Sequence, residues 1–102
     1  MTQKITDFGR RNDEIRRQGL FGPDQASPLM VTPGVADLGE DALEELVLAF
    51  MRFDNFDSGD DPYGNRDFGA LKAGDTTVWF KIDPKKDAPD DRVVTFLLPD
   101  EH

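Results

Sequence analysis

The sequence has no cysteine and a single histidine, which is the last of its 102 residues. Without cysteine the chain cannot form a disulfide bond, a thiolate metal site or a cysteine nucleophile. A Ser-His-Asp arrangement would need His102 to be held rigidly, whereas chain ends are usually frayed. Glycine-rich phosphate-binding motifs are absent as well. We therefore expect a protein that is not an enzyme and that uses no cofactor.

Long hydrophobic runs are also missing. No segment approaches the ~18 consecutive apolar residues of a membrane span, and residues 1–5 lack the apolar stretch of a secretion signal. We expect a cytoplasmic protein that does not interact with membranes. The composition, with 37% hydrophobic residues and eight phenylalanines, is too apolar for a disordered chain. At this length one domain, residues 1–102, is expected.

Basic residues are few, and the negative charge is concentrated in one part of the chain. There are 12 Lys and Arg against 21 Asp and Glu, for a net charge of −9. From residue 24 to residue 61 there are ten acidic residues and one basic residue, so this segment carries the whole net charge. Such a field repels nucleic acid and anionic membranes and attracts basic partners or cations. We therefore expect no direct nucleic-acid binding and a partner protein with a basic surface.

Two segments have the spacing of amphipathic helices. Residues 40–53 are the clearest, because apolar residues recur there at i, i+3, i+4 and i+7; they are Leu43, Leu46, Val47 and Phe50. We expect Asp37 to cap this helix, with Glu40 as its partner in the first turn. Residues 4–18 form a thinner helix that Gly19 ends. Its inner side is predicted to hold Ile5, Phe8, Asn12 and Ile15, and its solvent side Arg10, Arg11, Arg16 and Arg17.

After the acidic segment the apolar period changes from that of a helix to that of a strand. Residues 67–72, 76–82 and 92–98 are predicted strands, with a hairpin turn at 73–75. Residues 29–32 form a short edge strand, since proline lies on both sides of it. The fold class is therefore α+β: an antiparallel sheet of three to four strands packed on a central amphipathic helix, with an additional N-terminal helix.

Alternation along the second of these strands places Trp79 on the sheet face that does not pack on the central helix. That face is mixed, with Val93 and Leu97 among threonines and lysines. A tryptophan there is either covered by the N-terminal helix or exposed as an anchor for a partner. Of the two we favour cover by the helix.

Acidic residues crowd the central helix and the loop that follows it. The helix carries four carboxylates over about 9 Å of its axis, and duplex DNA carries one charge per ~1.7 Å, so the two charge densities are comparable. The predicted partner-binding residues are Glu40, Asp41, Glu44, Glu45, Asp54, Asp57, Asp60, Asp61 and Trp79. An EF-hand calcium loop is excluded, because Phe56, Ser58 and Asn65 occupy positions where that loop needs ligands. No metal site is assigned.

Four stretches of the chain resemble a small bacterial domain family of unknown function. They are residues 31–39, the Asp-Pro-Tyr-Gly-x-x-Asp-Phe-Gly block at 61–69, the Trp-Lys-Ile-Asp-like strand at 79–83, and the terminal strand with its acidic tail at 92–101. The chain departs from the family at Asn65 and Arg66, where members typically have Glu-His. If that pair were catalytic or bound a metal, this chain has lost it. Such genes occur on chromosomes, plasmids and phages, which implies an anti-defence role by association.

Three hypotheses follow for the function. The first is a non-enzymatic inhibitor that blocks the basic, nucleic-acid-binding surface of a host complex, of the anti-CRISPR or anti-restriction type. The second is a carboxylate metal-binding or hydrolytic domain that uses Asp57, Asp60, Asp61 and Asp67. The third is a housekeeping protein–protein module that docks through Trp79 and its sheet face. The sequence leaves the oligomeric state open.

Overall fold

A computed structural model describes residues 5–22, 27–54, 64–88 and 91–101 of the chain. Along the chain the elements are α1 (Asp7–Gln18), β1 (Leu29–Val31), α2 (Pro33–Ala36), α3 (Glu40–Arg52), β2 (Phe68–Ala73), β3 (Thr76–Pro84), β4 (Arg92–Leu97) and the 3-10 turn η1 (Pro99–Glu101). Both long helices and all four strands correspond to predicted segments, with ends that differ by a few residues. In the described part of the chain, no helix is long and apolar enough to cross a membrane.

The four strands form one sheet in the order β1-β4-β3-β2. β2, β3 and β4 pair antiparallel as expected, but β1 pairs parallel with β4, so the sheet is mixed. The direction of β1 differs because the chain leaves it into α2 and α3 and returns to the sheet at the opposite edge, through β2. The predicted α+β class is confirmed, with three helices and a four-stranded sheet among the described residues.

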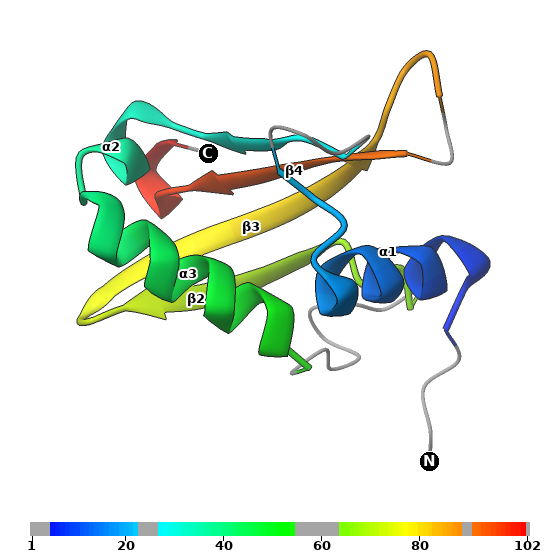
Figure 1. Ribbon diagram of the computed structural model, residues 1–102, viewed down its shortest axis with the longest axis horizontal. Coiled ribbons are helices and arrows are strands. Elements are labelled where there is room, and N and C mark those ends of the chain that lie inside the picture. The colour runs from blue at the N-terminus through cyan, green and yellow to red at the C-terminus, as the bar shows by residue number, and fades with distance from the viewer. Residues whose placement is uncertain (1–4, 23–26, 55–63, 89–90, 102) are drawn as a thin grey trace.

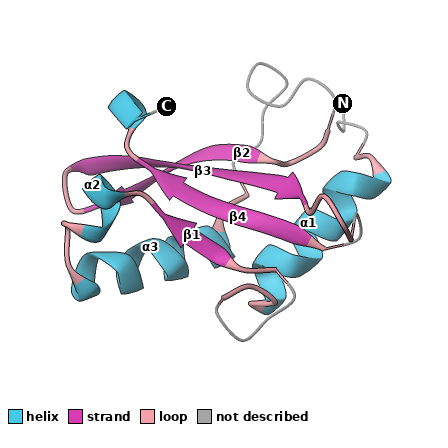
Figure 2. Ribbon diagram, turned by 90° about the horizontal axis from the view of Figure 1, so that it is seen from above, coloured by secondary structure: helices cyan, strands magenta, loops and turns pink. Residues whose placement is uncertain are grey.

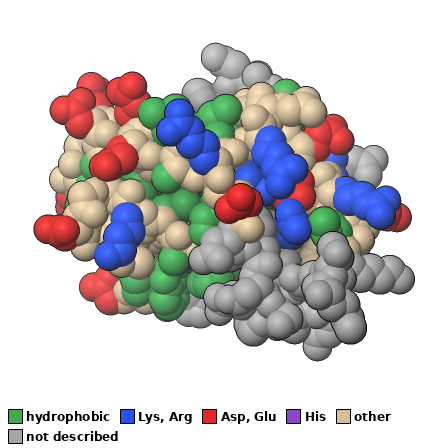
Figure 3. Space-filling model, turned by 90° about the horizontal axis from the view of Figure 1, so that it is seen from below, with side chains coloured by type: hydrophobic (Ala, Val, Ile, Leu, Met, Phe, Trp, Pro, Cys, Tyr) green, Lys and Arg blue, Asp and Glu red, His purple; other side chains and the backbone are tan. Residues whose placement is uncertain are grey.

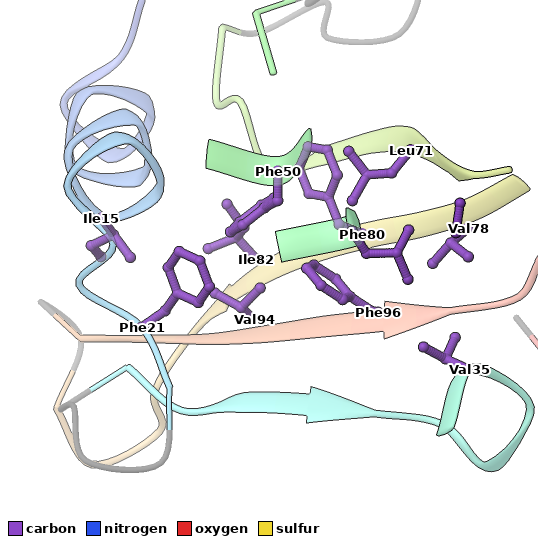
Figure 4. Close-up of a cluster of buried hydrophobic side chains, with 12 residues drawn as sticks. Ile15, Phe21, Val35, Phe50, Leu71, Val78, Phe80, Ile82, Val94 and Phe96 are labelled. Carbon is purple, nitrogen blue, oxygen red and sulfur yellow. The ribbon is translucent and has the colours of Figure 1, made fainter. Parts of the chain in front are cut away.

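α1 and α3 lie side by side on the same face of the sheet (Figure 1, Figure 2). The core between them and the sheet is centred on Phe50 of α3, which is fully buried. Its ring makes edge-to-face contacts with Phe21, Phe80 and Phe96, at centroid distances of 5.0, 4.8 and 5.4 Å. Figure 4 shows these rings with the aliphatic side chains that surround them. This apolar layer is what holds α3 against the sheet.

The predicted cap of α3 is wrong. Asp37 is the C-cap of α2, directly after Ala36, and α3 follows Gly39, whose φ of 95° belongs to the left-handed region. The cause is the short helix α2, which begins with Pro33 in its first turn, at a position where the missing N–H of proline costs nothing. Pro33 was expected only to follow the short edge strand of residues 29–32. It instead begins one additional helical turn.

The expectation that α1 covers Trp79 is also wrong. Val78 and Phe80 point into the core under α3, so Trp79 between them points to the other face of the sheet. α1 instead packs beside α3, and its Ile15 is part of the same core. Trp79 is half-buried, and its ring meets the edge of the Phe68 ring at a centroid distance of 5.4 Å.

Candidate functional site

The four acidic residues of α3 point to solvent, as the sequence predicts. We call them the acidic face: Glu40, Asp41, Glu44 and Glu45, all of them exposed. Leu46 and Phe50, on the opposite side of the helix, have no exposed surface and hold α3 in place. The carboxylate of Glu45 also accepts a hydrogen bond from the backbone N–H of Gly74, at 3.2 Å, in the turn between β2 and β3. The acidic face is therefore presented by a rigid element.

Charge is distributed unevenly over the surface of the molecule. Figure 3 shows acidic side chains gathered at the end where α3 begins and where the β2–β3 turn lies. Asp37 and Asp75 are further exposed acids next to these elements. Basic side chains gather over the other end of the same view, on the side of α1. The surface thus has an acidic end and a more basic end.

The predicted partner-binding residues do not form one surface. Asp54 is exposed directly after α3, at the other end of the helix from the acidic face. Trp79 lies on the opposite face of the sheet from α3, so the acidic face and Trp79 cannot contact a flat partner together. Asp57, Asp60 and Asp61 lie outside the described residues.

The carboxylate metal hypothesis finds no support in the described part of the chain. Across residues 5–22, 27–54, 64–88 and 91–101, no group of three or more His, Cys, Asp or Glu side chains could hold a metal ion. Asp67 is half-buried, and its backbone carbonyl accepts a hydrogen bond from the N–H of Ile82 at 2.8 Å. The hypothesis therefore depends on the three aspartates of 57–61.

A buried polar cluster beneath α1 was not predicted from the sequence. The carboxylate of Asp13 forms ion pairs with Arg16, at 2.7 Å, and with Arg66, at 2.9 Å. Arg16 has no exposed surface, so the prediction that it lies on the solvent side of the helix is wrong. It follows Asn12 by one helical turn, and both therefore point inward. Asp13 compensates the charge that this burial isolates from water.

Asn12 connects the same cluster to β4. Its amide donates to the backbone carbonyl of Asn65 at 2.9 Å, and its Oδ1 accepts from the Nε of Arg92 at 2.8 Å. The guanidinium of Arg92 lies over the ring of Phe8, 4.2 Å from its centroid, and its backbone N–H donates to the hydroxyl of Ser27 at 3.1 Å. Segments that are far apart in sequence are joined here by amide and guanidinium groups.

The start of α1 is hydrogen-bonded to residues 64–65 and packs closely against them. The backbone N–H of Thr6 donates to the carbonyl of Gly64 at 3.2 Å, and the Thr6 hydroxyl donates to the side chain of Asn65 at 2.9 Å. Thr6 also caps the helix by accepting from the N–H of Gly9. A Cβ on Gly9 would lie 2.2 Å from the carbonyl oxygen of Gly64. Glycine is therefore required at a helix position where it ordinarily weakens the helix.

The two arginines of this cluster each show an unusual feature. Burial lowers the pKa of the Arg16 guanidinium, and the hydrogen bond to Asp13 opposes that shift. Arg66 has a positive φ of 51°, which is uncommon for a residue with a side chain. The one sequence signal for the cluster was Asn12, a polar residue on the inner side of the predicted N-terminal helix.

Comparison with protein families assigns the chain to one of them. The model of the DUF3768 family, described as a protein of unknown function, matches residues 31–101. Because this match covers more than half of the chain, the protein belongs to that family, and the expected membership in a family of unknown function is confirmed at this level. No curated protein and no solved structure matches the chain. α1 precedes the matched residues, and yet its polar side chains contact Asn65, Arg66 and Arg92 within them.

Proposed function

We propose that this protein is a non-enzymatic binding protein that docks its acidic face onto a basic surface of a partner protein. The observation that carries the proposal is the presentation of four exposed carboxylates by one rigid helix. Carboxylates at this spacing approach the charge density of a nucleic-acid backbone, at roughly one charge per 2 Å against one per ~1.7 Å. A surface that binds nucleic acid through Lys and Arg would accept such a helix in its place.

The partner that fits this chemistry is a host nucleic-acid-handling complex, such as a CRISPR or restriction effector. Occupation of its basic groove by the acidic face would exclude the nucleic acid and inhibit the complex. The same charge repels free nucleic acid and anionic lipid, so neither is proposed as a direct partner. Association would depend on salt, because charges separated by more than about 10 Å are largely screened at 0.1 M.

The test is a charge-reversal experiment with a matched control. One variant carries Glu40→Lys, Asp41→Lys and Glu44→Lys, which spares Glu45 and its contact with the β2–β3 turn. The control carries Asp83→Lys, Asp87→Lys and Asp100→Lys, exposed acids away from α3, and so has the same net charge. Each protein is used at low and at high salt to capture partners from a host lysate, and captured proteins are identified by mass spectrometry.

The expected result is a salt-sensitive capture of a nucleic-acid-binding complex by wild type and by the control, with loss in the α3 variant. Duplex DNA added to the captured complex should release it, because both compete for one basic surface. Equal capture by the α3 variant and wild type would refute the proposal. So would a capture that neither high salt nor DNA reduces.

A second candidate function is docking through the sheet face that carries Trp79. Two observations favour it: both long helices lie on the other face, and the apolar side chain of Met30, on the edge strand next to β4, is 54% exposed. In this case a Trp79→Ala variant, and not the α3 variant, would lose the captured partner. The fluorescence spectrum of Trp79 should also shift on binding, and an unchanged spectrum would count against this candidate.

A further inference from the structure

β2 forms one edge of the sheet. Its pairing register with β3 determines which of its backbone N–H and C=O groups point away from β3. Among the described residues, β3 is its one strand neighbour (Figure 1). The N–H of Ile82 donates to the carbonyl of Asp67, so the residues that exchange hydrogen bonds with β3 are Gly69, Leu71 and Ala73. The alternate residues, Phe68, Ala70 and Lys72, therefore direct their N–H and C=O groups away from β3. Ala70 and Lys72 are also exposed.

The two edges of the sheet differ in how well they resist pairing with another strand. Sheet edges are commonly protected by proline, by bulges or by being very short. β1 has three residues and is flanked by Pro28 and Pro33. β2 has six residues, no proline, and a pairing with β3 that runs without a break from Phe68↔Lys81 to Ala73↔Thr76. β2 is thus a long, regular edge.

We propose that β2 pairs antiparallel with β2 of a second copy of the chain, which joins two four-stranded sheets into one. A second copy fits because the edge is self-complementary about Ala70. With Ala70 on a two-fold axis, the small side chains of the two Ala70 residues meet, and each Phe68 lies opposite Lys72 of the second copy. That pair combines packing of the lysine stem with attraction between the ammonium and the ring.

The position of α3 relative to β2 determines how two copies would meet on the helical face of the joined sheet. In the first half of α3, the carboxylate of Glu45 accepts a hydrogen bond from the N–H of Gly74. Just after the end of α3, Phe53 lies so close to Gly69 that a Cβ there would be 2.7 Å from the ring. α3 therefore runs antiparallel along β2. Two α3 helices would then run antiparallel to each other across the axis, with Ala42, Glu45, Ala49 and Arg52 on one side of each helix. Because Gly69 is next to Ala70, the ends of the two α3 helices lie near the axis, and Glu45 lies farther from it.

The dimer is independent of the proposed binding function, because Glu40, Asp41 and Glu44 are not part of the pairing. It is measured on the full chain by sedimentation equilibrium between about 1 and 200 μM, where a weak dimer dissociates. The decisive variant is Ala70→Pro. It removes an outward N–H next to the axis and leaves every hydrogen bond between β2 and β3 in place. Two hydrogen bonds are lost per dimer, so Kd should rise by about tenfold or more.

Two further variants keep the test valid if proline disturbs the strand. Ala70→Lys places two like charges together on the axis, which should raise Kd at least about as much as the proline variant. Met30→Lys makes the same charge change at the other edge and should leave Kd unchanged. Circular dichroism establishes that each variant is folded.

A wild-type chain that stays monomeric at the highest concentration would overturn the proposal. A dimer whose Kd is unchanged by the two Ala70 variants but rises with Met30→Lys would overturn it as well.

Discussion

α1 and α3 lie next to each other on one face of the sheet, but they are attached to it by different chemistry. α3 contributes Leu46 and Phe50 to the apolar core, and neither has any exposed surface. α1 contributes one fully buried apolar side chain, Ile15, and its polar attachments run from Asn12 to Asn65 and Arg92 and from Asp13 to Arg66. The first attachment is non-directional and scales with buried area, whereas the second depends on the positions of individual atoms.

This difference has an energetic consequence for the two helices. Apolar burial is gained over many contacts, so no single atom of α3 decides whether it stays in place. A buried ion pair gains little over an apolar replacement of both partners, but it costs much when one partner is removed. α1 is therefore the more easily detached of the two helices, and four tests can sharpen or break this contrast.

The largest effect is expected at the centre of the apolar attachment. Phe50→Ala removes the ring that contacts Phe21, Phe80 and Phe96 and should destabilise the whole protein by about 3–5 kcal/mol. Urea unfolding followed by circular dichroism measures this loss. Leu48→Ala is the control on the same helix, at a side chain that is 46% exposed, and should change stability by less than about 0.5 kcal/mol. Similar losses for the two variants would contradict the core described for α3.

The next effect is expected at the carboxylate that joins α1 to the loop of residues 64–66. Asp13→Asn keeps the shape of the side chain but removes the charge between Arg16 and Arg66, at a cost of about 2–3 kcal/mol. The loss should be local. Hydrogen exchange should accelerate at the backbone amides of α1, while those of α3 keep their protection.

Asp7→Asn is the matched control, because Asp7 lies in the same helix with its side chain fully exposed. It should leave exchange nearly unchanged. Equal acceleration in α1 and α3 after Asp13→Asn would show that the two helices unfold as one unit, which would refute the contrast between them.

A third test exchanges glycine and alanine in each helix. Both exchanges should destabilise the protein, but for different reasons. Helix propensity alone predicts that Gly9→Ala stabilises α1 and that Ala49→Gly destabilises α3 by about 1 kcal/mol. Because a Cβ on Gly9 would collide with the carbonyl of Gly64, we expect Gly9→Ala to destabilise instead, by roughly 1–2 kcal/mol. Thermal unfolding of both variants measures the signs. A stabilised Gly9→Ala protein would mean that α1 does not approach Gly64 closely.

The same contrast explains which parts of the fold could be predicted from the sequence. The spacing of Leu46 and Phe50 is a local pattern, and so is the alternation of Val78, Phe80 and Ile82, so α3 and β3 were predicted with nearly correct ends. The direction of β1 was not predictable in this way, because it depends on where the chain returns after α3. The helix α2 was missed because Pro33 and Gly34 occur both in turns and in first helical turns.

For the candidate site, only part of the arrangement was visible in the sequence. The exposure of Glu40, Asp41, Glu44 and Glu45 follows from the helical period, and it was predicted. The contacts of Asp13 with Arg66 and of Asn12 with Arg92 join residues more than fifty positions apart, and no local pattern encodes such pairs. An inward asparagine was a signal, but its partners could be known only from the three-dimensional fold.

The smallest effect is expected at a polar attachment that is exposed to solvent. The carboxylate of Glu101 accepts hydrogen bonds from the hydroxyl of Thr32 and from the backbone N–H groups of Leu98 and Gly34, and so ties η1 to the start of α2. These bonds, that of Thr32 first, hold the pKa of Glu101 below the ordinary value for glutamate. Like Asp13 of α1, Glu101 attaches its segment through a carboxylate. The carboxylate of Glu101 differs in being exposed to solvent.

The sign of the pH dependence follows from the direction of that shift. A carboxylate whose pKa is lower in the folded state stabilises the fold above the ordinary glutamate pKa, about 4.3, and loses this contribution as the pH falls through the lowered pKa. Glu101→Gln should therefore reduce Tm slightly at neutral pH and flatten the loss of Tm below about pH 4.3. Asp100→Asn, at the exposed neighbouring residue, is the control and should keep the wild-type profile. If Glu101→Gln changed Tm as much as Asp13→Asn does, exposure to water would not be what separates a weak polar attachment from a strong one.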